Sequence, residues 1–598
     1  MPDRLSSRRG VELVQRLLHF LVGPTRVTTF RLLWIALLLY GERIVFHNAA
    51  NTCQWPDASA SSASQSEPLP AVHVLLVTDP QIIDRDTYPD LPFPDLVYPL
   101  VRHFSDNYLK NVWTALAVNP NKWLHRGQIL PPSQEARRKP ISRSGLVQPP
   151  DGVVWMGDLT DGGRRGRTEA EWTALVERFH NIFWRPREAD WKALHSTLST
   201  TRQLIVPRTS ATMFIPTFYL SGNHDIGLPG TTSGHRLDTL ASEDAIDRFN
   251  RDFGMKVDGG GFVVKERNPF KRTSLNGRIL VSTHESLGAT HELIMVNAQD
   301  LVGMERQGGG PFDTHLSSDH LGKLDGQLGH NAQNTYKETY DFVESFEHDG
   351  IHVPRVLFTH VPLHRPEGTT CNDAARSSLH GVYRESTRPL HQGTDRDSTY
   401  QNMVSPSVTD WVLKSIEPAA VFSGDDHDHC EYRHARINSS APTTSVADGF
   451  TQDQIPELTV KSLSMTEGVR KPGFARLSLF SPPFSAQGST VQYTSMAYTP
   501  CLLPDQIGIW TRLYLPFFAI SVLGLFLWPR LVKGESEKAG YLPLSHQRKR
   551  DDDDPPMTGE REAYRTGNVK TQRWKRDVLA VIIVALPFWI FCQTHFLF

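Results

Sequence analysis

The chain has 598 residues, 39% of them hydrophobic and 21% charged, and its formal net charge at pH 7 is -2. This length and apolar content allow a large buried core and exclude disorder of the whole chain. The near-neutral charge argues against a nucleic-acid-binding protein, which normally carries a basic excess or a basic face, and five cysteines without C-x-x-C spacing argue against a zinc knuckle or a thioredoxin-like site.

The N-terminal end holds a short apolar stretch. Residues 32–41 are uncharged, but Arg31 precedes them and Glu42 and Arg43 follow. This length suits a short membrane anchor or a signal-type segment, and either would send the following chain across a membrane; a buried core helix is the alternative. We expect a cytosolic segment at residues 1–27, the anchor or signal-type segment at 28–47 and a linker at 48–69.

Residues 70–500 show the pattern of one α/β domain. Short apolar runs stop abruptly at Gly, Asp or Pro, as buried strands do, and apolar residues recur at helical spacing in residues 169–183 and 238–253. Alternating runs at 457–463, 474–479 and 491–498 predict antiparallel strands that complete a second sheet. Residues 230–290 and 303–355 are expected to hold insertions. The six buried runs are 72–77, 153–156, 213–220, 293–296, 356–358 and 419–422.

Two stronger membrane candidates lie near the C-terminal end. Residues 513–528 are uncharged, and residues 578–598 carry only His595. We predict terminal transmembrane helices at 507–528 and 577–598, again with a buried core helix as the alternative. Residues 529–576 between them, which include Asp551–Asp554, are expected to form a disordered cytosolic loop.

The charges beside these spans predict the orientation of the chain. Arg and Lys collect before the first span and between the last two, so the positive-inside rule places residues from about 48 to 507 in the lumen. The Asn438-Ser439-Ser440 sequon is compatible with that side. An oxidising lumen would permit up to two disulfides, with the pairing left open by the sequence, among Cys53, Cys371, Cys430 and Cys501.

Five polar clusters follow the predicted strands. Open α/β sheets bind ligands with the loops at the carboxyl ends of their strands, so these clusters are expected to converge. Each offers carboxylate, amide or imidazole groups beside a glycine or a strand end, as a metal site requires. The clusters are Asp79-Pro80-Gln81, Gly157-Asp158-Leu159-Thr160-Asp161-Gly162, Gly222-Asn223-His224-Asp225, Thr359-His360 and Gly424-Asp425-Asp426-His427-Asp428-His429.

In this order the clusters resemble the calcineurin-like metallophosphoesterase superfamily, whose pattern is D-x-H, G-D-x-x-D, G-N-H-D/E, H and G-H-x-H. The resemblance spans residues 79–429. It implies a metallophosphoesterase-type β-sandwich flanked by helices, and hydrolysis of a phosphate ester with two divalent metal ions. A lone GD or a lone histidine is more often a turn or a core residue, but five ordered matches at strand ends favour the enzyme.

Within the superfamily the chain is similar to the branch that removes ethanolamine phosphate from mannoses of glycosylphosphatidylinositol (GPI) anchors. The similarity rests on Asp79-Pro80-Gln81-Ile82 with Thr87-Tyr88-Pro89, on residues 358–363 and on residues 423–428. It implies GPI-anchored protein glycans as substrate, a multi-pass location in the membrane of the endoplasmic reticulum or Golgi, and a role in protein export with unidentified transport partners. The chain ends THFLF instead of the dilysine signal often found in that branch, so the retaining compartment is left open.

The resemblance also implies the ligands. They are expected to be Asp79, Asp158, Asn223, His360, Asp425 and His427, together with Gln81. Gln81 replaces the usual histidine, which leaves three roles open: an amide-oxygen ligand, a water-mediated ligand or a hydrogen-bond partner. In the last motif the ligands are either Asp425 and His427 or His427 and His429, and the register of Gly424 favours the first pair. Oxygen in place of nitrogen favours manganese, with magnesium or zinc as alternatives.

The implied mechanism gives each residue a role. Asp158 is expected to bridge the two ions, which activate a shared water for in-line attack. His224 is the predicted general acid for the leaving oxygen, and Asp161 orients its ring. Three other functions compete with this one: a lumenal phosphoesterase for another phosphorylated lipid, nucleotide or protein; a catalytically inactive cargo-binding relative; and a structural membrane protein whose Asp and His clusters are solvated loops.

Overall fold

In the computed structural model of the protein, the chain forms two compact units. One unit is Phe46–Asp505, and the other combines Met1–Val45 with Gln506–Phe598. The structure describes residues 25–57, 71–85, 87–88, 92–116, 150–161, 167–183, 204–205, 217–227, 243–254, 275–283, 288–307, 336–347, 349, 353–366, 368–371, 375–377, 403–436, 445–446, 454–481, 494–531 and 559–594. Residues 58–69 of the linker predicted at 48–69, the Asn438 sequon and Asp551–Asp554 lie outside these residues, and residues 48–52 of that linker are helical.

Two mixed sheets form the larger unit. The first has the order β10-β13-β12-β1-β2-β4 and the second the order β3-β5-β6-β7-β8-β11-β9. The first contains β1 (Ala71–Val77), β2 (Gly152–Met156), β4 (Thr217–Leu220), β10 (Ser445–Val446), β12 (Gly473–Phe480) and β13 (Thr494–Leu502). The second contains β3 (Leu204–Ile205), β5 (Gly277–Val281), β6 (His291–Met295), β7 (Arg355–Phe358), β8 (Ala420–Ser423), β9 (Cys430–Ala435) and β11 (Gln454–Thr459).

Alternation along the strands packs the sheets face to face. Successive side chains of a strand point to opposite faces of its sheet. In β7, Val356 and Phe358 therefore join a core shared by both sheets, whereas Leu357 packs in a separate cluster with the helices. The shared core also contains Val154 and Met156 of β2. The predicted β-sandwich is confirmed.

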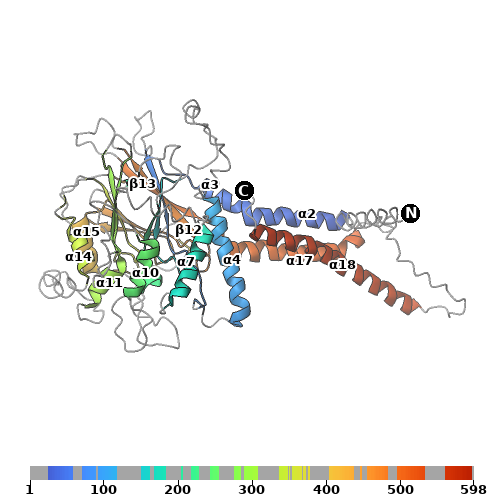
Figure 1. Cartoon of the computed structure of the whole chain (residues 1–598). Coiled ribbons are helices and arrows are strands. Elements are labelled where there is room, and N and C mark those ends of the chain that lie inside the picture. Colours follow the sequence, from blue (N-terminus) through green and yellow to red (C-terminus); the bar gives the residue numbers. More distant parts are fainter. Residues whose placement is uncertain are drawn as a thin grey trace, which may run out of the picture. The chain divides into compact units, whose positions relative to one another are not determined.

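Helices cover both outer faces, which completes an α/β/β/α arrangement (Figure 1). On the second sheet, α11 (Ala298–Gln307), α14 (Lys337–Glu344) and α15 (Pro406–Ile416) bury their apolar faces. On the first sheet, α4 (Pro94–Ala115), α7 (Glu169–Phe183) and α10 (Glu243–Phe253) supply an aromatic cluster in which Trp113, Phe179 and Phe183 pack against Trp155 of β2. Aromatic pairs of this kind add to the stability gained from burial.

The late strands differ from the prediction. They were expected to complete one antiparallel second sheet, but β12 and β13 pair in the first sheet, where β12 lies antiparallel to β1. β11 lies in the second sheet, parallel to β8 and antiparallel to β9. The regions expected to hold insertions contribute core elements, among them α10 and β5 in the interval 230–290.

The smaller unit is helical. Its N-terminal part contains α2 (Thr25–Leu39) and a π-helical turn (Tyr40–Ile44), which α3 (Val45–Thr52) follows in the chain. Its C-terminal part contains α16 (Gln506–Ile509), a second π-helical turn (Trp510–Tyr514), α17 (Leu515–Leu531) and α18 (Gly559–Thr594). Arg26 pairs with Asp577 at 2.6 Å, and the carboxylate of Glu42 accepts hydrogen bonds from the Tyr514 hydroxyl and the Trp589 indole. These contacts give Arg26, which precedes the apolar stretch at 32–41, and Glu42, which follows it, partners within the smaller unit.

Of the helices that the structure describes, one is long and apolar enough to cross a membrane, Gln506–Trp528. It coincides with the span predicted at 507–528. The predicted spans at 28–47 and 577–598 are helical in their described residues and stay predictions as membrane spans. The expected disorder of residues 529–576 is wrong for residues 559–576, which begin α18.

Two disulfides form within the larger unit. Cys53 pairs with Cys501, and Cys371 pairs with Cys430, while Cys592 of α18 is unbridged and buried. Together with the candidate membrane helix, these bonds indicate a location in the secretory or membrane system, because disulfides persist in oxidising compartments.

We expect the Cys371–Cys430 bond to stabilise the larger unit mainly by restricting its unfolded chain. The 59-residue separation corresponds to about 4 kcal/mol by the chain-entropy relation, which is an upper value. The Cys371→Ser, Cys430→Ser variant should therefore unfold at lower guanidinium concentration, as followed by tryptophan fluorescence. Cys592→Ser is the control, and equal midpoints for both variants would contradict this role.

Candidate metal centre

The candidate centre lies where six strands end, three from each sheet. β1, β2 and β4 belong to the first sheet, and β7, β8 and β11 to the second. The N–H of Gly424 donates to the carbonyl of His360 at 2.8 Å, and the N–H of Leu463 donates to the carbonyl of Thr78 at 2.9 Å. The second bond joins a loop of one sheet to a loop of the other. The predicted convergence of the five motifs is therefore present, with a sixth loop added after β11.

Five residues of these loops adopt a left-handed backbone. Non-glycine residues avoid this region because the Cβ atom crowds the backbone. Such strained residues cluster at functional sites, where the surrounding structure holds them in place. All five belong to the set of ligands predicted from the sequence: Asp79 (φ 48°), Gln81 (φ 38°), Asp158 (φ 49°), Asp425 (φ 65°) and His427 (φ 56°).

Two motif glycines allow the loops to approach one another. A Cβ atom on Gly157, which has φ 100°, would overlap the ring of His360. A Cβ atom on Gly222 would overlap both the carboxylate and the backbone nitrogen of Asp158. Any larger residue at these positions would displace a predicted ligand.

Asp79, Asp158 and His427 form one group whose ligand atoms lie within 4.8 Å of one another. The Thr78 hydroxyl donates to Oδ2 of Asp79 at 2.6 Å, whereas Oδ1 of Asp79 is buried without a hydrogen-bond partner among the described residues. Burial raises the pKa of Asp79 to about 8. Burial lowers the pKa of His427 to about 4, so its ring is neutral at pH 7 and can coordinate a cation.

Gln81 reaches into this group. Its Nε2 lies 2.9 Å from His427 Nε2 and 3.2 Å from Asp158 Oδ2, while its Oε1 is buried without a partner in the described part of the chain. The two ends of a side-chain amide are distinguished only by their hydrogen bonds. A half-turn of the amide would aim Oε1 between the neighbouring ligand atoms. This placement is compatible with direct ligation, and the role of Gln81 stays a prediction.

Asp158, His360 and Asp425 form a second group that shares Asp158 with the first. His360 Nδ1 lies 2.7 Å from the Met156 carbonyl, so it donates its proton there and leaves Nε2 toward the group. His360 Nε2 lies 3.2 Å from Asp158 Oδ1 and 3.1 Å from Asn223 Oδ1. Burial lowers the pKa of His360, but the charge of Asp158 raises it by more, so the net shift is upward. The surroundings of His360 Nε2 therefore favour a positive charge.

These residues fit a pair of divalent cations. Asp79 and Asp425 each bury one carboxylate oxygen that accepts no hydrogen bond from the described residues, which is costly unless a cation is nearby. Carboxylate and amide oxygens dominate the set, with one imidazole in each group. Because Asp158 belongs to both groups, it is placed to bridge the two ions.

His224 lies beside the two groups. Its Nδ1 is 2.9 Å from Asp161 Oδ1, and its Nε2 is 3.8 Å from Asp158 Oδ2. The carboxylate of Asp161 therefore holds one ring nitrogen and turns the other toward the centre. The N–H of His224 also donates to Asp158 Oδ1 at 2.8 Å. This is the arrangement that the sequence predicted for an acid and its orienting residue.

Two acidic residues of the site had no role assigned from the sequence. Asp225 accepts hydrogen bonds from the N–H groups of Gly222, Leu159 and Thr160, so it ties two motif loops together. Its position three residues after a glycine, in the first turn of a helix, could have indicated this capping role. Burial, followed by the charge of Asp158, raises its pKa to about 6.

Glu467 is the second of these residues. It lies in the loop after β11, and its Oε2 is 3.9 Å from Nδ1 of His427. Burial, followed by the charge of Asp161, raises its pKa to about 8. The signal that could have indicated it was a set of polar residues, Ser464, Thr466 and Glu467, directly after the strand predicted at 457–463.

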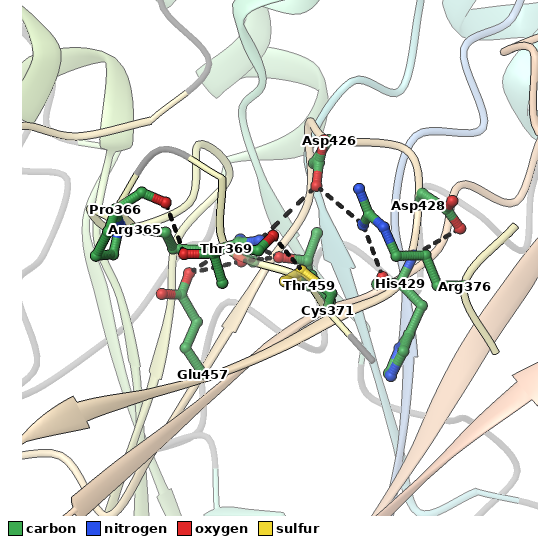
Figure 2. Close-up of a disulfide and its surroundings, with 12 residues drawn as sticks. Arg365, Pro366, Thr369, Cys371, Arg376, Asp426, Asp428, His429, Glu457 and Thr459 are labelled. Atoms are coloured by element: carbon green, nitrogen blue, oxygen red, sulfur yellow. Dashed lines mark hydrogen bonds and ion pairs between the residues drawn. A yellow bond between two sulfur atoms is a disulfide. The ribbon is translucent and has the colours of Figure 1, made fainter. Parts of the chain in front are cut away.

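The loop after β8 is anchored from behind the centre (Figure 2). Asp425 and His427 face the centre, whereas Asp426 lies 3.7 Å from both Arg365 and Arg376. Asp428 accepts a hydrogen bond from Lys461 at 2.6 Å, and Cys430 forms its disulfide with Cys371. The loop is thus held on its far side by ion pairs and a covalent bond.

His429 lies on that far side. Its carbonyl accepts a hydrogen bond from Arg376 at 2.9 Å, and its side chain belongs to neither of the two ligand groups among the described residues (Figure 2). This placement agrees with the register in which Asp425 and His427 are the ligands.

No protein-family model matches the chain. The chain is similar to cell division control protein 1 of Saccharomyces cerevisiae, with 26% identity over 478 residues that make up 79% of this chain and 68% of the yeast protein. The two proteins are distant homologues. This relationship confirms the resemblance to the calcineurin-like metallophosphoesterases, and the buried Asp and His groups agree with a metal-dependent phosphoesterase.

We expect Gly222→Ala to release metal, because the added methyl group would displace Asp158 from both groups. Bound metal per chain, measured by mass spectrometry after dialysis, should fall severalfold. Gly288→Ala is the matched control, since a Cβ atom at Gly288 meets no atom within 4 Å. Full metal content in a folded Gly222→Ala protein would show that Asp158 is not a ligand.

A pair of variants separates binding from catalysis. Asp158→Ala should lose bound metal, whereas His224→Ala should keep it and lower the turnover of a phosphodiester by about 10² to 10⁴, the usual contribution of an oriented general acid. Both quantities can be measured on the same preparations. Normal turnover in His224→Ala would eliminate it as the acid.

Proposed function

We propose that this chain is a two-metal phosphodiesterase that removes ethanolamine phosphate from a mannose of the GPI-anchor glycan in the lumen of the early secretory pathway. The observation that carries the chemistry is the pair of Asp and His groups that share Asp158, with the His224–Asp161 pair beside them. Removal of the phosphate would promote the maturation and export of GPI-anchored proteins.

Asp79, Asp158 and His427 would hold one cation, and Asp158, His360 and Asp425 the other, with Asn223 and Gln81 at their edges. When bound, two divalent cations lower the pKa of a shared water and neutralise charge on the phosphoryl oxygens. The oxygen-rich ligands favour manganese, with magnesium or zinc as alternatives.

His224 supplies the proton for the leaving group. With Nδ1 paired with the Asp161 carboxylate at 2.9 Å, a protonated ring carries its second proton on Nε2, which lies on the side of Asp158. When a water oxygen bonds to phosphorus and the bond between phosphorus and the mannose oxygen breaks, this proton moves to the mannose oxygen and the ring becomes neutral. The proton that the water loses passes to the solvent. The carboxylate of Asp161 stabilises the charged ring before transfer and fixes its orientation throughout.

The proposed substrate is supported by the sequences around the candidate ligands, since the ligands themselves suit any phosphate ester. Residues 79–82, 358–363 and 423–428 resemble the branch that acts on GPI glycans, and all three segments border the centre. The candidate membrane helix agrees with a substrate that is itself attached to a membrane.

The proposal is tested with the full chain in detergent, supplied with Mn²⁺ and a synthetic mannose glycan that carries ethanolamine phosphate. Wild-type protein should release ethanolamine phosphate, and Asn223→Ala should reduce the rate at least about 100-fold, because loss of a ligand removes catalysis beyond a single hydrogen bond. Hydrolysis of a generic diester without release from the glycan would contradict the substrate. Hydrolysis of neither would contradict the enzymatic function.

A further inference from the structure

We propose that Glu467 binds a positively charged group of the substrate and thereby makes the centre selective for phosphodiesters that carry an ammonium group a few bonds from phosphorus. This inference rests on the proposed phosphodiesterase function and narrows its substrate class. It assigns substrate recognition to the loop after β11, which none of the five motifs includes.

The position of Glu467 suits this role. Its side chain is 13% exposed and lies beside His427 of the first ligand group, so the carboxylate adjoins the centre and is reached by solvent. Its Oε1 accepts a hydrogen bond from the Thr466 hydroxyl at 2.9 Å. Its Oε2 lies 3.9 Å from His427 Nδ1, which is too long for a hydrogen bond. Among the described residues, Glu467 pairs with this histidine and with no lysine or arginine.

The surroundings of Glu467 are also acidic. Asp161, next to His224, is close enough for its charge to act on Glu467, and both carboxylates act on the hydroxyl of Tyr88. That hydroxyl donates to the carbonyl of Thr466 at 3.4 Å. Tyr88, Asp161 and Glu467 therefore lie near one another on this side of the centre.

A carboxylate in this place is unfavourable for an ordinary phosphodiester. The substrate carries a negative charge on the phosphoryl group, and like charges a few ångströms apart in a partly buried site repel one another. An ammonium group on the substrate reverses the sign of this interaction. An ammonium group beside Glu467 opposes the burial and the charge of Asp161 that raise the pKa of this group, so it favours the ionised carboxylate. The carboxylate then accepts charge-assisted hydrogen bonds from the ammonium, which donates three.

The alternative role for Glu467 is to orient His427. A histidine that binds metal commonly donates its other ring nitrogen to a carboxylate. Here the 3.9 Å separation leaves that bond unmade, so the carboxylate retains capacity for a donor from the substrate. The two roles predict different effects of one substitution.

The test compares two substrates on the full chain with Mn²⁺: a mannoside 6-(2-aminoethyl phosphate) and its 6-(propyl phosphate) isostere, which keeps the phosphoryl charge but lacks the ammonium group. Wild-type protein should prefer the aminoethyl diester in kcat/KM by about 10- to 100-fold, the effect of a hydrogen bond to a charged group. In Glu467→Gln this ratio should fall to near one, mainly through KM for the aminoethyl diester. Glu177→Gln, an exposed carboxylate on α7, is the matched control and should keep the ratio.

Dissociation constants for non-hydrolysable analogues, with a methylene group in place of the mannose oxygen, make the test independent of turnover. Tighter wild-type binding of the aminoethyl analogue, lost in Glu467→Gln, supports the inference even if neither diester is hydrolysed and the proposed function fails. Equal wild-type affinity for both analogues overturns it while leaving the phosphodiesterase in place. An equal loss on both substrates with a lower metal content in Glu467→Gln also overturns it, because Glu467 then acts through His427.

Discussion

The crowding of three buried carboxylates, Asp79, Asp158 and Asp425, is the constraint on which the centre depends. Negative charges brought together out of water repel one another, and burial, to which the charges of Asp158 and Asp425 add, raises the pKa of Asp79. Divalent cations held by these carboxylates would remove the cost and turn repulsion into attraction. The left-handed backbone of these residues is a second unfavourable feature. The charge repulsion and the backbone strain together place the candidate ligand atoms where they would reach one pair of metal ions.

The sandwich and the centre support each other. Each sheet alone would offer only half of the loops, and the contacts between Asn223 and His360 and between Leu463 and Thr78 exist only when both sheets are packed. Proper packing of the apolar core between the sheets therefore sets the distances between ligands. Conversely, cations held by loops from both sheets would bind only the folded protein and so stabilise it.

Local patterns predicted the local structure well. The helical spacing of residues 169–183 corresponds to α7, and the apolar runs before His360 and Asp425 correspond to β7 and β8. Sheet membership was partly wrong because pairing partners such as β1 and β12 lie far apart in the chain. β9 was missed because its sequence, CEYRHA, is polar and partly exposed.

Within the centre, the motifs predicted which residues converge but not what supports them. The five clusters meet because they follow strands whose ends lie together. The hydrogen bonds of Asp225, the approach of Glu467 to His427 and the pairing of Cys371 with Cys430 depend on tertiary contacts that spacing does not encode. The metal-ligand assignments themselves stay predictions.

The loop after β8 shows how closely its length is constrained. Its residues alternate in direction: Asp425 and His427 turn inward, while Asp426 and Asp428 turn outward toward guanidinium and ammonium groups. Removing one residue would exchange these two sets. The loop would still be acidic. However, the imidazole of His427 would lie among the arginine and lysine side chains, and Asp426 and Asp428 would face the metal centre. The odd-numbered positions of this loop therefore carry the predicted ligands, and the even-numbered positions carry its anchors. A shift of one residue would place each set where the other is required.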